Sequence, residues 1–450
     1  MQFYDLAFLS LIAGCGVLSY QQYRKSDGES APEEKSLTQN TVTPRAKAEA
    51  AQFTRLFLAV YCLVMASDWL QGPYVYSLYK DQFNLEERIV GLLFVTGFIS
   101  GAISGYYVGQ FADKHGRKTA CLIFCITYSL GCFSTLVPSL PVLFCGRVLG
   151  GLSTSIMYSC FEGWMVTEYH KRHLDEAGMS LSGLFGIMTT MNSVVAIVAG
   201  VFSEWLVRMT NTKRAPFMAS AGLLSIAFWL ILAYWTENYG DSHTEDATSS
   251  KSSSATVPAK NALKTIISDK RILTLGLASC FFEGSMYLFV FFWTPALKAA
   301  RGEASPLPLG MIFACFMASV MLGSLLFNLL ITKYALLTPL TLLTIIFALS
   351  SSALVVTITL KSEILTFWCF CLFEMCVGMY FPSMGTLKGR FVEDGVRARV
   401  YGILRIPLNI FVVVALSLMK EGEVYRNQVF LTCGGLLVVT SGIFHWIVQE

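Results

Sequence analysis

GQFADKHGRK, residues Gly109–Lys118, is the polar stretch that decides how the remainder of this sequence is interpreted. Long apolar stretches flank it near residues 89–112 and 119–137. Gly109 allows a neighbouring helix to approach closely, and Gly116 permits a tight reversal that a Cβ atom would oppose. The stretch therefore predicts a sharp turn between two long apolar helices.

The charged side chains of this turn indicate the side of a membrane on which it lies. Lys114, Arg117 and Lys118 are typical of a cytoplasmic loop, because such loops carry an excess of Lys and Arg. Asp113 can pair with basic groups at neighbouring helix ends. An ordinary polar turn flanked by basic residues is the alternative interpretation.

The composition indicates a membrane protein. Of the 450 residues, 54% are hydrophobic and only 14% are charged, which is more apolar surface than a soluble protein of this length could bury. The net charge of +3 is too small to indicate a nucleic-acid partner. The sequence has no phosphate-binding Gly-Lys-Ser/Thr loop and no nucleophile–base set or cofactor motif. We therefore expect neither an enzyme nor a bound cofactor.

Cysteine and histidine carry little functional information here. Nearly all of the 13 cysteines lie inside apolar runs, so we expect them to pack between helices. His170 and His173 have a possible metal-ligand spacing, but no third ligand lies near them. No metal site is expected.

The apolar runs predict the membrane spans. Twelve runs are long enough to cross about 30 Å of hydrocarbon. They lie near residues 56–79, 89–112, 119–137, 140–166, 180–206, 215–235, 272–294, 307–331, 338–359, 363–386, 399–418 and 427–448. An extra run, Phe3–Tyr20, is followed rather than preceded by basic residues, which argues against a cleaved signal peptide. The expected fold is an all-α membrane protein with thirteen spans.

Five parts make up the predicted organisation of the chain. They are an N-terminal transmembrane anchor (1–22), a cytoplasmic linker (23–54), an N-terminal six-helix half (55–236), a cytoplasmic central linker (237–271) and a C-terminal six-helix half (272–450). The central linker is assigned from Glu237–Lys264, which is rich in Ser, Thr, Asp and Lys. With Gly109–Lys118 inside, the cytoplasmic segments hold about twice as many Lys and Arg as the outside loops.

The pattern Gly-x-x-x-Asp-(Arg/Lys)-x-Gly-Arg-(Arg/Lys) within Gly109–Lys118 resembles the loop between transmembrane helices 2 and 3 of the major facilitator superfamily. This resemblance implies two six-helix halves, a central cavity lined by helices 1, 4, 7 and 10, and transport by alternating access. The predicted gating residues on the cytoplasmic side are Gly109, Asp113, Gly116, Arg117, Lys118 and Glu168. Of these, Asp113, Arg117 and Glu168 are expected to clamp the helix ends together.

Ionisable residues inside the predicted spans are the candidates for function, because each is unfavourable in lipid unless it faces a cavity or a partner. They are Asp68, Arg147, Glu162, Glu283, Glu374 and Arg405. The four carboxyl groups lie on the helices that would line the cavity, and we expect them to serve proton coupling. Structural pairing between helices is the alternative for any one of them.

Gln71 and Tyr74 are candidates for substrate binding beside Asp68. Gly72-Pro73 removes one backbone hydrogen bond between them and permits a kink. Tyr74, Tyr76 and Tyr79 form an aromatic stripe that could line the cavity or only pack, and the sequence leaves both possibilities open.

Several segments resemble the eukaryotic molybdate-anion transporter family. They are Asp68–Tyr74, Gly146–Ser155, Phe161-Glu162, Glu237–Tyr239, Phe282-Glu283, Phe289–Pro295, Gly378–Met384 and Arg405–Pro407. The resemblance covers roughly residues 55–420. It implies that the substrate is molybdate, a small inorganic anion, and that the protein is a multi-pass protein of the cell membrane. No obligate protein partner is evident, and the lipid bilayer is the expected surrounding.

A dianion would be repelled by four ionised carboxylates unless some were protonated, and burial favours the neutral form of a carboxyl. We therefore predict proton–oxyanion symport, with Glu283 binding the proton. Arg405 and Arg147 would bind the anion, because a guanidinium can donate two parallel hydrogen bonds to paired oxygens. Three alternatives stay open: a proton-coupled sugar or other organic solute, a non-transporting receptor or scaffold, and an Arg405 that only pairs with a carboxylate such as Glu374.

Overall fold

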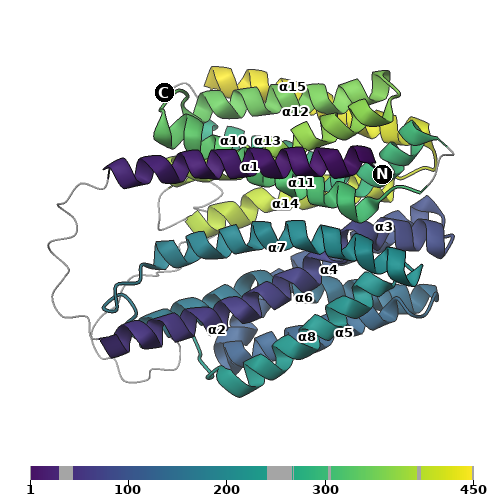
Figure 1. The fold of residues 1–450 in the computed structure, drawn as a ribbon. Coiled ribbons are helices and arrows are strands. Elements are labelled where there is room, and N and C mark those ends of the chain that lie inside the picture. Colours follow the sequence, from purple (N-terminus) through teal and green to yellow (C-terminus); the bar gives the residue numbers. More distant parts are fainter. Residues whose placement is uncertain are drawn as a thin grey trace. The chain divides into compact units, whose positions relative to one another are not determined.

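The computed structural model describes residues 2–29, 44–240, 266, 268–302, 306–392 and 397–447. Within these residues the chain is helical and contains no strand, as the sequence predicts (Figure 1). The long helices are α1 (Gln2–Glu29), α2 (Pro44–Trp69), α4 (Glu87–His115), α5 (Arg117–Ser134), α6 (Leu140–Lys171), α7 (Leu181–Thr210), α8 (Ala215–Tyr234), α10 (Lys270–Arg301), α11 (Leu309–Phe327), α12 (Pro339–Thr359), α13 (Glu363–Phe391), α14 (Arg397–Ser417) and α15 (Glu423–Ile447). Short turns of helix, η1 (Gly72–Tyr74), α3 (Val75–Ser77), η2 (Leu78–Gln82) and η4 (Asn328–Lys333), continue α2 and α11.

Twelve helices in the described part of the chain are long and apolar enough to cross a membrane. The first of them, Phe3–Gln22, lies within α1. Helix α5 falls outside this set, because its 18 residues begin with the basic side chains of Arg117 and Lys118. The protein is therefore a multi-pass, all-α membrane protein.

The chain divides into two compact units. The C-terminal unit comprises Met1–Arg24, Glu86–Gly91 and Ser249–Glu450, and the N-terminal unit comprises Lys25–Leu85 and Leu92–Thr248. Helix α1 thus belongs to the unit that contains α10–α15, although it precedes α2 in the sequence.

Helices of the N-terminal unit pack around aromatic rings and small residues. Helix α5 packs against α6 and α8, and α2 packs against α7 and α8. The rings of Trp164 and Trp235 stack with centroids 3.7 Å apart. Helices α4 and α6 touch through backbone atoms, because a Cβ atom on Gly151 would lie only 2.3 Å from the carbonyl oxygen of Gly97. Small residues permit this approach, as in other membrane helix pairs.

Helices of the C-terminal unit use the same device. Helix α11 packs against α13, α12 against α13 and α15, and α10 against α13, α14 and α15. A Cβ atom on Gly378 of α13 would lie 2.0 Å from the carbonyl oxygen of Val320 in α11. A Cβ atom on Gly323 of α11 would lie equally close to the carbonyl oxygen of Met375 in α13. The crossing of α11 and α13 therefore depends on two glycines.

Helix α1, drawn in purple in Figure 1, is joined to α11 and α13 along its length. The hydroxyl group of Tyr4 donates a hydrogen bond of 2.5 Å to Oε1 of Glu363, and the Tyr4 ring meets Phe367 edge-on at 5.1 Å. Farther along α1, Cys15 Sγ contacts the carbonyl oxygen of Ala318 at 3.4 Å. Helix α1 is consequently an integral helix of the C-terminal unit.

Candidate functional site

The carboxyl group of Asp68, near the end of α2, has partners within the N-terminal unit. The hydroxyl group of Tyr128 in α5 donates a hydrogen bond of 2.5 Å to Asp68 Oδ1. Arg147 of α6 interacts electrostatically with the same carboxyl group. The hydrogen bond from Tyr128 and the positive charge of Arg147 thus partly compensate the charge of Asp68.

Arg147 lies where α6 crosses α4. Its Nε donates a hydrogen bond of 3.3 Å to the carbonyl oxygen of Leu93, and its guanidinium lies 5.2 Å from the centre of the Phe94 ring. Gly97 leaves room for the guanidinium, because a Cβ atom there would come within 3.0 Å of it. Part of the hydrogen-bonding capacity of Arg147 is therefore used within its own unit.

Gln71 and Tyr74 also make buried contacts in the N-terminal unit. Gln71 is 8% exposed and donates a hydrogen bond of 3.0 Å to a backbone carbonyl one turn earlier. Tyr74 is 2% exposed, and its hydroxyl group donates a hydrogen bond of 2.7 Å to Glu204 Oε2. Tyr76 and Tyr79 are similarly buried, so the rings of the aromatic stripe pack against the protein.

A second group of charges lies in the C-terminal unit around Glu283 of α10. Tyr380 of α13 donates a hydrogen bond of 3.0 Å to Glu283 Oε1, and Nζ of Lys388, two turns farther along α13, lies 3.7 Å from the same oxygen. The side chains of Lys388 and Glu283 are 18% and 14% exposed. Arg405 of α14 interacts electrostatically with Lys388. One carboxylate, one phenol and one ammonium group thus meet at this place, and the positive charge of Arg405 acts on the ammonium group.

Arg405 and Glu374, like Glu162, have no hydrogen-bond or ion-pair partner among the described residues. Arg405 is exposed within the candidate span Val400–Ser417, and no described group accepts a hydrogen bond from its guanidinium. Glu374 is 6% exposed, and no described group donates a hydrogen bond to its carboxyl. The two side chains do not pair with each other, so this part of the structure gives no support to an Arg405–Glu374 ion pair.

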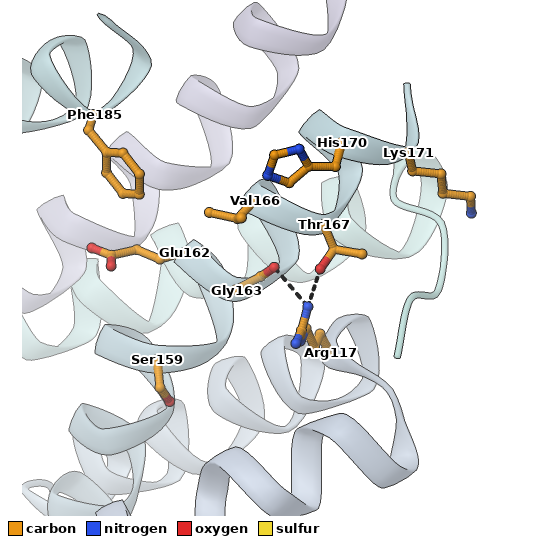
Figure 2. A pocket seen from close by; sticks show the side chains of 9 residues that line it. All are labelled: Arg117, Ser159, Glu162, Gly163, Val166, Thr167, His170, Lys171 and Phe185. Atoms are coloured by element: carbon orange, nitrogen blue, oxygen red, sulfur yellow. Dashed lines mark hydrogen bonds between the residues drawn. The ribbon is translucent and has the colours of Figure 1, made fainter. Parts of the chain in front are cut away.

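The Gly109–Lys118 turn is held by a network of short contacts. Gly116 has a φ of 103°, a conformation that favours glycine. The Arg117 guanidinium donates hydrogen bonds of 2.8 and 3.1 Å to Asp113 Oδ1. Figure 2 shows the same guanidinium directed at α6, where it donates to the carbonyl oxygen of Gly163 and to the hydroxyl group of Thr167. Arg117 therefore ties α4 and α5 to α6.

The close approach predicted at Gly109 is not seen in the described structure, because no atom lies within 4 Å of the position of a Cβ on this residue. Helix α4 instead approaches α6 at Gly97 and Gly101, where a Cβ on the facing Gly151 would meet their backbone atoms. Small residues on both helices, rather than at the end of one, permit this contact.

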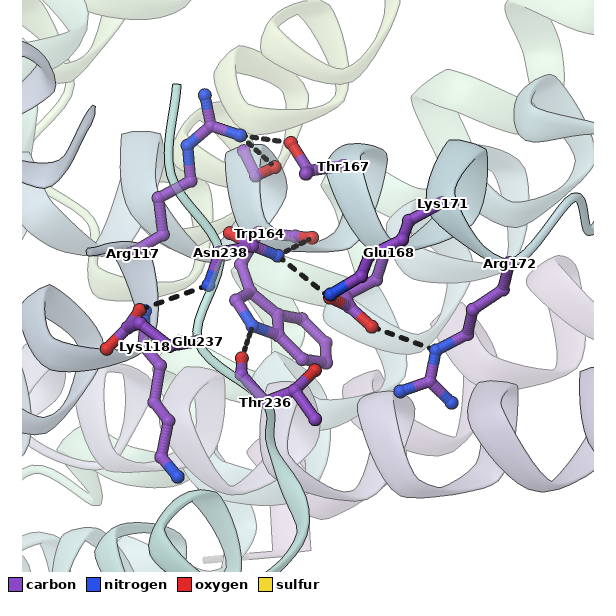
Figure 3. Close-up of polar contacts among 11 residues, drawn as sticks. Arg117, Lys118, Trp164, Thr167, Glu168, Lys171, Arg172, Thr236, Glu237 and Asn238 are labelled. Atoms are coloured by element: carbon purple, nitrogen blue, oxygen red, sulfur yellow. Dashed lines mark hydrogen bonds and ion pairs between the residues drawn. The ribbon is translucent and has the colours of Figure 1, made fainter. Parts of the chain in front are cut away.

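The segment that follows α8 packs onto the turn (Figure 3). Glu237 accepts hydrogen bonds from the backbone N–H groups of Lys118 and Thr119 at 2.8 and 3.1 Å, and from the Thr119 hydroxyl at 2.7 Å. A carboxylate at the start of α5 also interacts favourably with the helix dipole. A Cβ atom on Gly116 would lie 2.4 Å from this carboxylate, so glycine is required there for a second reason.

Glu168, expected to clamp with Asp113 and Arg117, has other partners. It is 1% exposed, and it accepts hydrogen bonds of 2.8 Å from Arg172 Nε and 3.3 Å from Asn238 Nδ2. It contacts neither Asp113 nor Arg117 in the part of the chain that the structure describes. Glu168 therefore holds the segment after α8 through Asn238. The backbones of Arg117 and Asp113 hold it separately, since Arg117 N–H donates to the carbonyl oxygen of Asn238 at 2.9 Å and Gly240 N–H donates to that of Asp113 at 3.2 Å.

Glu162 borders a cavity of about 830 Å³ in the N-terminal unit (Figure 2). The lining residues are Arg117, Ser159, Glu162, Gly163, Val166, Thr167, His170, Lys171 and Phe185. The Glu162 carboxyl group is exposed, and Figure 2 shows it pointing away from Arg117 toward Phe185. Glu162 thus has access to an open space.

Three partners of these candidates do not emerge from the sequence pattern. Tyr128 is uncharged and stands out in no motif. Tyr380 lies within the segment Gly378–Met384 but is uncharged, and Lys388 lies beyond the predicted span 363–386. One signal could have indicated Lys388: it lies eight residues after Tyr380, a spacing that places both on one face if the helix continues.

The fold is that of a transporter of the major facilitator superfamily. A family described as Sugar-transporters, 12 TM, matches residues 3–368. The chain belongs, within that superfamily, to the molybdate-anion transporter family. It is 32% identical to a Danio rerio protein named Molybdate-anion transporter, with 96% of this chain and 92% of that protein covered. A Takifugu rubripes protein of the same name is 31% identical, with 86% and 84% covered.

Solved structures agree with this fold. The nucleoside transporter NupG superposes with a TM-score of 0.65 at 15% identity, covering 88% of this chain and 99% of that one. The POT family transporter PepTSo gives a TM-score of 0.69 at 12% identity, covering 88% and 97%. The relatives are named as transporters, and the chain is accordingly a transporter rather than an enzyme.

Proposed function

We propose that this protein takes up molybdate across a membrane by alternating access, together with protons, and that Arg405 binds the anion. The relatives named Molybdate-anion transporter support the choice of substrate. The observation that carries the site is the exposed guanidinium of Arg405 inside a candidate span without a partner among the described residues. A charge in this setting is unfavourable unless it faces a cavity, a partner or a ligand, and we assign it to the ligand.

The remaining candidates divide into two roles in this proposal. Glu283, Glu374 and Glu162 are the carboxyl groups that bind and pass the proton. Asp68 accepts a hydrogen bond from Tyr128 and attracts Arg147, so it helps to orient that guanidinium, the proposed anion-binding cation of the N-terminal unit.

Arg405→Lys tests the anion site. A lysine keeps the charge but cannot donate two parallel hydrogen bonds. Loss of one hydrogen bond to a charged group, about 1.5–3 kcal/mol, should weaken apparent molybdate affinity about 10- to 100-fold. The assay is uptake of molybdate by cells that express the protein, at two pH values, with tungstate, sulfate and common sugars as competitors.

Arg45→Lys is the matched control, because Arg45 is 89% exposed and pairs only with Glu49 one turn away among the described residues. Tungstate should compete nearly as well as molybdate, and the smaller sulfate less well. An unchanged apparent affinity for molybdate in Arg405→Lys would show that the anion does not bind at this residue. If the cells take up a sugar and molybdate does not compete with that uptake, the substrate is a sugar rather than molybdate.

A further inference from the structure

We propose that Lys388 binds the anion in the C-terminal unit together with Arg405. Ionised Glu283 pairs with Lys388, and protonated Glu283 releases it. This inference rests on the proposed uptake of an oxyanion at Arg405 and adds a residue and a coupling mechanism to that site. Lys388 is absent from the sequence-based candidates because it was expected in a loop.

The pairing of Lys388 with Glu283 is close but loose. The distance of 3.7 Å between Nζ and Oε1 exceeds the usual 2.7–3.2 Å of an N–H···O hydrogen bond. Tyr380 donates a hydrogen bond of 3.0 Å to the same oxygen, so the phenol and the ammonium compete for it. Lys388 also lies 5.7 Å from the centre of the Tyr401 ring, which faces it from α14. A long, flexible lysine between these groups can change partners without a change in the backbone.

The charges of this group match a dianion only after protonation. Lys388 and Arg405 carry one positive charge each, and ionised Glu283 carries one negative charge, which leaves a single net positive charge. A proton on Glu283 leaves two positive charges, equal and opposite to those of a doubly charged oxyanion. Protonation also releases Lys388 from Glu283. One proton therefore removes the carboxylate that competes with the anion for Lys388 and raises the net charge of the group from +1 to +2.

Among the described residues, no second carboxylate pairs with Lys388. Glu423 of α15, which packs against α10, pairs with Lys361 and Arg426 instead. On α10 itself, Cys280 and Tyr287 interact with Glu283, and α13 contributes Tyr380 and Lys388. Arg405 of α14 acts on Tyr287 and Lys388. Helix α12 has no titratable residue in its sequence. In the part of the chain that the structure describes, Glu283 is therefore the carboxyl group that controls Lys388.

Molybdate binding to the purified full-length protein in lipid nanodiscs, between pH 5.5 and 8, tests the mechanism. The wild type should bind more tightly at low pH and take up one proton per molybdate in weakly buffered solution. Glu283→Gln should bind tightly at every pH and take up none. Lys388→Gln should lose about tenfold in affinity, the effect of one lost charge-assisted hydrogen bond, and Lys388→Arg should retain most of it.

The double variant Glu283→Gln, Lys388→Gln separates ligand binding from a structural ion pair. A structural pair predicts that neutralising both partners restores wild-type binding, whereas our proposal predicts that the double variant stays as weak as Lys388→Gln. Lys361→Gln is the control, because Lys361 also pairs with a glutamate, Glu423 at 2.9 Å, but is 71% exposed. Normal molybdate binding by Lys388→Gln at every pH would overturn the role of Lys388 alone. Failure of the wild type to bind molybdate would instead overturn the proposed function.

Discussion

Gly378→Ala should weaken the C-terminal unit strongly, because the added methyl group meets backbone rather than side-chain atoms. Its Cβ would lie 2.0 Å from the carbonyl oxygen of Val320, whereas ordinary contacts begin at 3.4 Å. Helices α11 and α13 would have to separate by about 1.4 Å at this point, and neither can rotate a side chain to relieve the contact. Overpacking costs typically about 1–3 kcal/mol, and a clash with backbone belongs at the upper end. At about 2–4 °C per kcal/mol, the melting temperature should fall by roughly 6–12 °C.

A thiol-reactive fluorogenic dye measures this change directly. Cys371 and Cys376, 4% and 0% exposed on the same helix, become reactive when α13 unfolds. Gly385→Ala is the matched control, since it also lies on α13 but has no atom within 4 Å of its Cβ position. It should raise the melting temperature slightly, because alanine is favoured over glycine in a helix by about 0.5–1 kcal/mol. Equal melting temperatures for the two variants would refute the argument that backbone contact sets this crossing.

The remaining predictions concern the Gly109–Lys118 turn. Asp113→Asn removes the charge that holds Arg117. The rate of molybdate uptake should therefore fall about fivefold, equivalent to about 1 kcal/mol, while the equilibrium affinity for molybdate stays unchanged. An equal loss in rate and affinity would contradict a gating role. Glu237→Gln replaces one acceptor oxygen at the start of α5 by an amide that faces N–H donors. The melting temperature should then fall by roughly 2–6 °C. If a second variant, Glu237→Ala, lowers the melting temperature and Glu237→Gln does not, the charge of Glu237 is dispensable.

The sequence predicts which segments are helical more accurately than it predicts where each helix ends. The run 363–386 predicts a span, and α13 indeed covers it, but the helix continues to Phe391. Hydropathy ends a span at the first charged residue, whereas a helix continues as long as its backbone hydrogen bonds close. Lys388 was therefore expected in a loop, although it lies on α13 beside Glu283.

Partners distant in sequence account for most of what was missed. Glu283 and Tyr380 are 97 residues apart, and no periodicity within either helix relates them. The residues Glu237–Gly240 are polar and were expected to begin a flexible linker. Asn238 is nevertheless 3% exposed, because Trp164 and Glu168 of α6 accept hydrogen bonds from its amide. Composition describes a segment alone and cannot show that another helix supplies its partners.

The position of α1 has a consequence for how the protein is made. The contact between Tyr4 and Glu363 joins residues 359 positions apart. At about 5–20 residues per second, roughly 20–70 s of synthesis separate the emergence of the two. Helix α1 must therefore stay in the bilayer without its native neighbours until α11 and α13 follow. Chaperones or insertion factors of the translocation machinery can hold α1 during that interval. A shortened α1 would impair the assembly of α11 and α13 rather than that of α2, the next helix in the chain.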